Sequence, residues 1–332
     1  MGVKKTNLME KGFVDAKVDE NINIVEEIQR LKKKKNAVIL GHYYQTADIQ
    51  DIADYLGDSL KLSQVAAETD ADIIVFAGVH FMAETAKILA PEKKVIIPDM
   101  NAGCSLADSC PPEEFRKFVK EHPDHTVISY VNTTAEIKTM TDICCTSTNA
   151  LQIVNYLPKD EKIIFAPDYN LGSYIKRISG REMLIWKGAC HVHEEFSVEK
   201  IIELKNEHPD AKVIAHPECE KPVLLTADHV GSTSSLLKYT KQDDSKEYIV
   251  ATESGIIHQM KKANPGKTFI VAPPKDSTCG CNDCNFMKLI TLKKIYNSLI
   301  YEVPTVELSN ETIEKAKKPI IRMLEISKEL GL

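Results

Sequence analysis

Long apolar runs are absent from this sequence. No stretch approaches the roughly 20 residues that a helix needs to cross a bilayer, and the first dozen residues lack the apolar core of a secretory signal peptide. An excess of one charge sign is also missing, since 42 Lys and Arg stand against 48 Asp and Glu along the chain. We therefore expect a cytoplasmic protein with neither a membrane nor a nucleic acid as its partner.

Several nucleotide and cofactor motifs are missing as well. The chain has no Walker-type phosphate loop and no G-x-G-x-x-G, so nucleotide binding is unsupported. It has no C-x-x-x-C-x-x-C run, which disfavours a radical enzyme that uses S-adenosylmethionine. It does have nine cysteines. In a reducing compartment these argue against a disulfide framework and for metal binding, catalysis or plain burial.

One pattern occurs three times along the chain. A short apolar strand runs straight into polar residues at 37–45, 126–134 and 212–220, with starts that lie 89 and 86 residues apart. A turn rich in Ser and Thr follows in each copy, at 57–63, 145–151 and 231–237. Second apolar strands are expected within 72–81, 162–170 and 247–255, and third strands within 94–99, 183–188 and 267–273, with helical patterns between them.

The period and the strand type together predict the fold class. A repeat of this length is too long for a solenoid, and continuous apolar strands alternating with helices are typical of parallel sheets buried on both faces. We predict three pseudo-symmetric α/β/α sandwich domains with parallel sheets around a central active site. The predicted parts are a loose extension at 1–20, repeats at 21–107, 108–194 and 195–284, and closing helices at 285–332 that complete the first repeat. Pro319 is expected to kink or break the closing helices.

A cysteine follows the third strand of every repeat. These are Cys104, Cys190 and a cluster of Cys279, Cys281 and Cys284. Parallel sheets bind ligands beyond the carboxyl ends of their strands, so one thiol per repeat predicts three thiolates meeting at one site. Within the cluster we choose Cys284, because it directly precedes a helical run whose dipole would stabilise a thiolate. Isolated cysteines are more often plain buried residues, and we assign that role to Cys110, Cys144, Cys145 and Cys219.

Three thiolates favour one kind of metal centre. Structural zinc prefers four closed ligands, and an iron–sulfur cluster usually takes four cysteines. A [4Fe–4S] cluster held by three leaves one iron open, which can act as a Lewis acid on a substrate. The C-x-x-C of Cys281 and Cys284 alone could also indicate zinc or redox chemistry.

Several motifs together resemble the quinolinate synthase family. They are G-H-Y-Y-Q, D-S-L, Y-V-N-T-T-A-E, W-K-G-A-C-H-V-H, H-P-E-C and the last cysteine followed by F-M-K, and they cover roughly residues 21–332 in the family's order. The resemblance implies one [4Fe–4S] cluster per chain, with the three cysteines as ligands. It also implies a transferase reaction of NAD biosynthesis, in which iminoaspartate and dihydroxyacetone phosphate give quinolinate, phosphate and water. The C-x-C-x-x-C spacing differs from the C-x-x-C-x-x-C of some members, which leaves the roles of Cys279 and Cys281 open.

Polar residues at the strand ends are the candidates for substrate binding and proton transfer. The candidates for substrate binding are His42, Ser59, Tyr130, Val131, Asn132, Ser147, His216, Pro217, Glu218 and Thr233. Glu218 is the best general acid–base, since burial beside a metal site can raise the pKa of a carboxyl; Tyr44 and His193 come next. The simpler alternatives are that the hydroxyls at 59, 147 and 233 only cap helices, and that Glu218 is an ordinary capping or ion-pairing residue.

Two other functions stay open on this sequence. One is an iron–sulfur hydro-lyase that acts on another small dicarboxylate. The other is a zinc-binding regulatory protein built around C-x-C-x-x-C, which predicts a colourless protein, whereas a cluster predicts a brown, oxygen-sensitive one. Iminoaspartate hydrolyses readily, so transient contact with the enzyme that supplies it is a plausible further partner.

Overall fold

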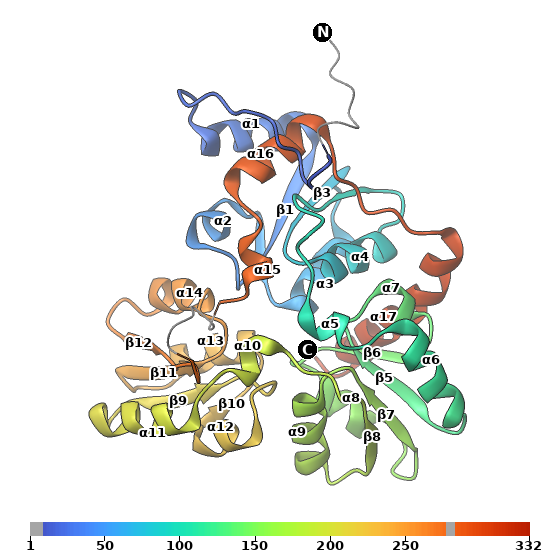
Figure 1. Cartoon of the computed structure of the whole chain (residues 1–332), viewed down its shortest axis with the longest axis vertical. Helices are drawn as coiled ribbons and strands as arrows, with labels where there is room; N and C mark the ends of the chain where they lie inside the picture. The colour runs from blue at the N-terminus through green and yellow to red at the C-terminus, as the bar shows by residue number, and fades with distance from the viewer. Residues whose placement is uncertain (1–8, 277–282) are drawn as a thin grey trace. The chain divides into compact units, whose positions relative to one another are not determined.

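The structure, a computed structural model, describes residues 9–276 and 283–332 (Figure 1). The chain forms two compact units. Unit 1 comprises Met1–Cys104 and Asn285–Lys317, and unit 2 comprises Ser105–Cys284 and Lys318–Leu332. Within the described ranges, no helix has both the length and the apolar character that crossing a membrane would require.

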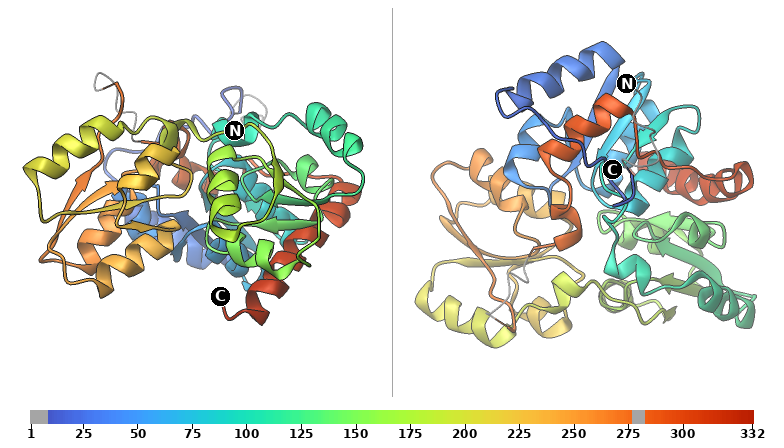
Figure 2. Two further views of the ribbon diagram at one scale, coloured as in Figure 1. Left: turned by 90° about the horizontal axis from the view of Figure 1, so that it is seen from below. Right: turned by 45° about the horizontal axis from the view of Figure 1, so that its top comes forward.

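Three parallel four-stranded sheets form the framework, each with helices beside it (Figures 1 and 2). The strands are β1 Ala37–His42, β2 Tyr55–Gly57, β3 Ile73–Ala77, β4 Lys94–Ile96, β5 Thr126–Tyr130, β6 Ile143–Cys145, β7 Ile163–Ala166, β8 Met183–Ile185, β9 Lys212–Ala215, β10 His229–Val230, β11 Glu247–Ala251 and β12 Thr268–Val271. The strand orders are β2-β1-β3-β4, β6-β5-β7-β8 and β10-β9-β11-β12. The chain thus repeats one topology three times, which confirms the predicted α/β fold class.

The helices connect these strands and close the chain. They are α1 Ile24–Lys35, α2 Ala47–Ile52, α3 Ser59–Glu68, α4 His80–Leu89, α5 Ser105–Asp108, α6 Pro112–Glu121, α7 Ala135–Lys138, α8 Ala150–Tyr156, α9 Tyr169–Ser179, α10 His191–Glu194, α11 Val198–Glu207, α12 Lys221–Thr226, α13 Thr233–Gln242, α14 Ile256–Ala263, α15 Asn285–Lys288, α16 Leu292–Tyr301 and α17 Asn310–Glu329. The inner strands β3 and β7 are buried at every position. Because successive strand residues face opposite sides, both faces of these strands are covered.

One aspartate holds the same place in each sheet. Asp54, Asp142 and Asp228 each accept a hydrogen bond at Oδ2 from a backbone N–H of the first strand of their repeat, 2.8 Å away in all three cases. The backbone N–H of each aspartate returns a bond to the carbonyl of that same strand residue. This reciprocal clamp fixes the start of the short strand that follows, so the three repeats share side-chain detail as well as topology.

The short strands β2, β6 and β10, which lie between the predicted first and second strands of each repeat, were not predicted. Each has only two or three residues and directly precedes the Ser/Thr-rich segment that the sequence pattern assigns to a turn. Pro319 was predicted to kink or break the closing helices; a break is wrong because Pro319 lies inside α17, and a kink stays a prediction. The apolar face of α17 is buried, including Ala316 and Ile320. Burial of this face offsets the hydrogen bond that proline removes.

The described part of the N-terminal extension is anchored to unit 1, in contrast to the loose segment predicted for 1–20. Val14 is buried, and the side-chain amide of Asn297 on α16 donates to the carbonyls of Val14 and Ala16. Residues 1–8 lie outside the described part of the chain. The second and third predicted repeats both belong to unit 2, and the exact repeat boundaries stay a prediction.

Candidate active site

Strand register identifies three equivalent positions at the carboxyl ends of the first strands. Gly41, Ser129 and Ala215 pair with alanines at the ends of β3, β7 and β11 respectively. The next residue in each repeat is a candidate from the sequence: His42 in unit 1, and Tyr130 and His216 in unit 2. Each of the three sheets therefore carries one aromatic side chain with a polar group at the equivalent strand end.

The two histidines at these positions are held in the same way. The Nδ1 atom of His42 accepts the backbone N–H of Tyr44 at 3.2 Å, and Nδ1 of His216 accepts the backbone N–H of Glu218 at 3.4 Å. When each ring is neutral, its proton must therefore sit on Nε2. For His216 this atom lies 3.2 Å from Ser147 Oγ. Each ring is thus fixed in orientation by the residue two positions further along.

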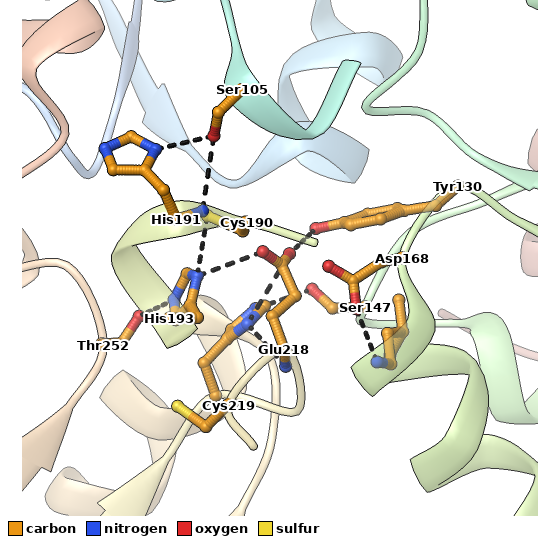
Figure 3. A network of polar contacts seen from close by, with 12 residues as sticks. Ser105, Tyr130, Ser147, Asp168, Cys190, His191, His193, Glu218, Cys219 and Thr252 are labelled. Carbon is orange, nitrogen blue, oxygen red and sulfur yellow. Dashed lines mark hydrogen bonds and ion pairs between the residues drawn. The ribbon is translucent and has the colours of Figure 1, made fainter. Parts of the chain in front are cut away.

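Glu218 is the centre of a buried polar network in unit 2 (Figure 3). Tyr130 donates its hydroxyl to Oε1 at 2.7 Å, and His193 Nδ1 lies 3.1 Å from Oε2. Glu218 is only 3% exposed. Burial acts to raise the pKa of its carboxyl, but interactions with His193 and His216 and the hydrogen bond from Tyr130 outweigh burial and lower that pKa to about 2. The raised pKa expected for Glu218 from its burial is therefore wrong, because its neighbours favour the charged form. The carboxylate is ionised and able to accept a proton.

His193 connects this carboxylate to the first half-buried cysteine of unit 2. Its Nδ1 lies 3.2 Å from Cys190 Sγ, its Nε2 lies 3.0 Å from Thr252 Oγ1, and its ring stacks on His216 with 4.7 Å between centroids. One donor atom each from Cys190, His193 and Glu218 lie within 4.8 Å of one another, close enough to hold a metal ion together. Sulfur chemistry and proton transfer are thus adjacent in this unit.

The candidate hydroxyl residues occupy equivalent positions, and none of them supplies the capping side chain of its helix. The register of the short strands makes Ser59, Ser147 and Thr233 equivalent. The capping positions belong instead to Asp58 for α3, Asn149 for α8 and Ser232 for α13. The capping alternative for these three hydroxyls is therefore wrong.

A cavity with a mixed lining adjoins this part of unit 2. It has a volume of about 380 Å³, with polar lining residues that include Ser147, Ser232 and Lys238 beside apolar ones such as Ile175 and Pro217. Two of these residues are candidates for substrate binding. The cavity gives a small polar molecule room beside the Glu218 network.

The described cysteines fall into two groups by burial. Cys104, Cys190 and Cys284 are partly exposed. Cys110, Cys144, Cys145 and Cys219 are fully buried, and burial raises the pKa of each thiol, to about 12 for Cys110 and Cys144. A thiolate is the form that binds metal, so the partly exposed group is the better suited to bind a metal. Cys279 and Cys281 lie outside the described residues.

Contacts within unit 2 hold residues beside the candidate cysteines. Ser105, the residue after Cys104, has its Oγ 2.6 Å from Nδ1 of His191, the residue after Cys190. The backbone N–H of Cys284 donates to Glu253 Oε1 at 3.2 Å. Glu253 in turn follows Thr252, the partner of His193. Within unit 2, Cys190 and Cys284 are therefore both linked to residues beside the Glu218 network.

Two buried carboxyl groups of this network escaped the sequence analysis. Asp168 and Glu253 are both 0% exposed, and register makes them equivalent to each other and to Val79 of the first repeat. Glu253 Oε2 also accepts the backbone N–H of Gly255. Asp168 Oδ1 accepts the backbone N–H of Leu171 at 2.6 Å, whereas Oδ2 has no partner in the described chain. An acidic residue two positions beyond the second strand, in two repeats, was the available signal.

Comparison with known proteins gives consistent matches along almost the whole chain. The family described as "NadA: Quinolinate synthetase A protein" matches residues 26–325. A quinolinate synthase of Synechocystis sp. is 60% identical over 305 residues, which are 92% of this chain and 96% of that protein. Quinolinate synthases of Chloroherpeton thalassium and Trichodesmium erythraeum are each 57% identical, over 307 and 316 residues. These alignments cover 92% and 94% of this chain, and 95% and 98% of the two relatives.

Proposed function

Because this chain belongs to the quinolinate synthase (NadA) family, we propose that it condenses iminoaspartate with dihydroxyacetone phosphate to give quinolinate, phosphate and water. The observation that carries the proposal is the ionised, buried Glu218, bonded to Tyr130 and His193 and adjacent to Cys190. Condensation and ring closure need protons removed from carbon and returned elsewhere. A fixed carboxylate flanked by two donors is suited to that task.

We propose Cys104, Cys190 and Cys284 as the ligands of one [4Fe–4S] cluster. Their support is their partial exposure, which the four other described cysteines lack, and the contact between Ser105 and His191, the residues that follow Cys104 and Cys190. Three thiolates leave one iron without a protein ligand, and such an iron supplies Lewis-acid chemistry to a bound substrate. The zinc alternative would instead use a closed set of four ligands.

The residues of the chain then have distinct tasks. Glu218 accepts a proton from the carbon that undergoes the keto–aldehyde shift and later returns it. His193, within hydrogen-bonding distance of that carboxylate, holds a second proton at Nδ1. Tyr44 of unit 1 is a third candidate for proton transfer. The positions proposed to bind the carboxylate and phosphate groups of the substrates are His42, Ser59, Tyr130, Val131, Asn132, Ser147, His216, Pro217 and Thr233.

An anaerobic assay tests this proposal directly. Protein purified without oxygen is incubated with oxaloacetate, ammonia and dihydroxyacetone phosphate, and quinolinate is measured by chromatography. We expect quinolinate to form only when all three are present. Water loss from another dicarboxylate without quinolinate would favour the hydro-lyase alternative. Iron and sulfide analysis of the same sample, with four of each expected per chain from a [4Fe–4S] cluster, separates the cluster from zinc.

The Glu218→Gln variant tests the role of the carboxylate. Since a positioned general base contributes about 10²- to 10⁴-fold to a rate, we expect turnover to fall by that order while iron content stays normal. Glu220→Gln is the control, because Glu220 is two residues away and forms an exposed ion pair with Lys275. Near-normal turnover in Glu218→Gln would remove Glu218 from this role.

The instability of iminoaspartate also suggests a supplier close at hand. We propose transient contact with the enzyme that produces it. In the test, the supplier enzyme replaces ammonia and oxaloacetate as the source of iminoaspartate. It is either mixed with this protein or kept on the far side of a dialysis membrane, at the same concentrations. We expect the separated arrangement to give less quinolinate.

A further inference from the structure

Lys138 is a charged side chain buried in unit 2 without an assigned role. It is the last residue of α7 and is 0% exposed. Burying an ammonium group costs several kcal/mol unless its hydrogen bonds are satisfied. A lysine retained at such a place therefore needs an explanation from its contacts.

The contacts of Lys138 converge on one short loop. Its Nζ donates to the carbonyl oxygens of Val131 at 2.9 Å and Thr133 at 2.5 Å, and lies 3.3 Å from Thr133 Oγ1. The same loop is tied to itself by the N–H of Thr133, which donates to the Val131 carbonyl, and to β6 by the N–H of Val131. This loop directly follows Tyr130 at the carboxyl end of β5.

The lysine fixes the direction in which Asn132 faces. The described peptide bonds here are trans, since the two cis bonds of the structure lie at Pro167 and Pro304. In a planar trans peptide the N–H points opposite to the carbonyl oxygen. With the Val131 carbonyl directed at Lys138, the N–H of Asn132 therefore points away from it. The side-chain Oδ1 of Asn132 is buried and has no hydrogen-bond partner among the described residues. Asn132 thus keeps hydrogen-bonding capacity that the fold does not use.

We propose that Lys138 is a positioning residue for the dicarboxylate substrate. It holds the Val131–Thr133 loop so that the N–H and side-chain amide of Asn132 meet a substrate carboxylate and Oδ1 accepts an N–H or O–H of the same molecule. The positive charge of Lys138 lies on the opposite side of this loop from the Asn132 N–H. Because the charge is buried, water does not screen its attraction for the substrate anion. The inference rests on the proposed function, since it concerns how that substrate is held.

Steady-state kinetics of Lys138→Met tests the proposal against a matched buried lysine. Lys32 of unit 1 is 5% exposed and also donates to a backbone carbonyl, that of Ile52, although it pairs in addition with Asp54. We expect Lys138→Met to raise the KM for the dicarboxylate, generated from oxaloacetate and ammonia, by on the order of tenfold, with kcat within about threefold. Lys32→Met should lower the thermal midpoint without moving KM. Equal KM values in wild type and Lys138→Met, or the same rise in both variants, would overturn the proposal.

A second variant keeps the test decisive if Lys138→Met does not fold. Asn132→Ala removes the presented side chain and leaves Lys138 and its three acceptors in place. It should raise KM for the dicarboxylate with wild-type iron content and thermal midpoint. An unchanged KM would refute the inference, whereas a wild-type enzyme that forms no quinolinate would refute the proposed function instead.

Discussion

Replacing Asp168 by Asn should make the protein more stable at high pH. Asp168 is fully buried, and burial, together with the negative charges of Glu218 and Glu194, raises the pKa of its carboxyl well above the usual value. In the unfolded chain the group ionises near the ordinary aspartate value of 3.8. Between the unfolded and the folded pKa values, folding therefore takes up a proton. Stability falls by about 1.4 kcal/mol per pH unit between the unfolded and folded pKa values.

The asparagine variant removes this cost and keeps the structural bond. Asp168 caps α9 by accepting the N–H of Leu171, and asparagine caps a helix about as well as aspartate. We expect Asp168→Asn to gain stability over wild type as pH rises, by about 1.4 kcal/mol per unit, and to match it below about pH 4. Asp168→Ala also escapes the protonation cost but loses the cap, which is worth about 0.5–2 kcal/mol.

Urea unfolding followed by circular dichroism at pH 5, 6.5 and 8 measures these differences. Ser197→Ala is the control for cap loss, because Ser197 caps α11 through the N–H of Lys200. Its effect should not change with pH. If Asp168→Asn is less stable than wild type at pH 8, or if its difference is the same at every pH, the carboxyl is ionised in the folded chain and the reasoning fails.

Three further predictions concern the site and the clamps. Tyr130→Phe removes a hydrogen bond that lowers the pKa of Glu218. The acid limb of the plot of kcat/KM against pH should therefore move to higher pH by about one unit. An unmoved limb would show that Tyr130 does not act on this carboxylate. Asp142→Ala leaves a backbone N–H without its partner and should cost about 1–3 kcal/mol in urea unfolding, unlike Asp160→Ala at an exposed site. With the proposed cluster bound, Ser105→Ala should speed iron loss to a chelator, because it removes the contact with His191. Ser109→Ala, whose hydroxyl donates to the nearby Leu106 carbonyl, should not.

Much of the fold follows from local pattern. The first and second strands of each repeat, such as β3 and β7, are apolar runs long enough to be recognised, and their spacing gave the threefold repeat. The strands β2, β6 and β10 were missed because each is short and runs into the Ser/Thr-rich segment, whereas β4 and β8, also of three residues, lie in longer apolar runs. The clamping aspartates were nevertheless visible, since Asp54, Asp142 and Asp228 each stand five residues before the candidate hydroxyl of their repeat.

The site was predictable where function follows from position along a strand. His42, Tyr130 and His216 were found because the first two end a first strand and the third directly follows one. Lys138 and Asp168 could not be found this way, because what distinguishes them is complete burial, and burial depends on segments that are distant in sequence. A lysine at the end of a short helix and an acid before one look like ordinary exposed residues in the chain alone.

The separation of the cysteines by burial has a practical consequence for handling the protein. Four thiols are shielded by the native core, so an alkylating reagent should reach them only after denaturation. Reagent uptake before and after urea would therefore report two things from a single sample: how much protein is correctly folded, and how well the surface sulfur atoms are protected by whatever they bind.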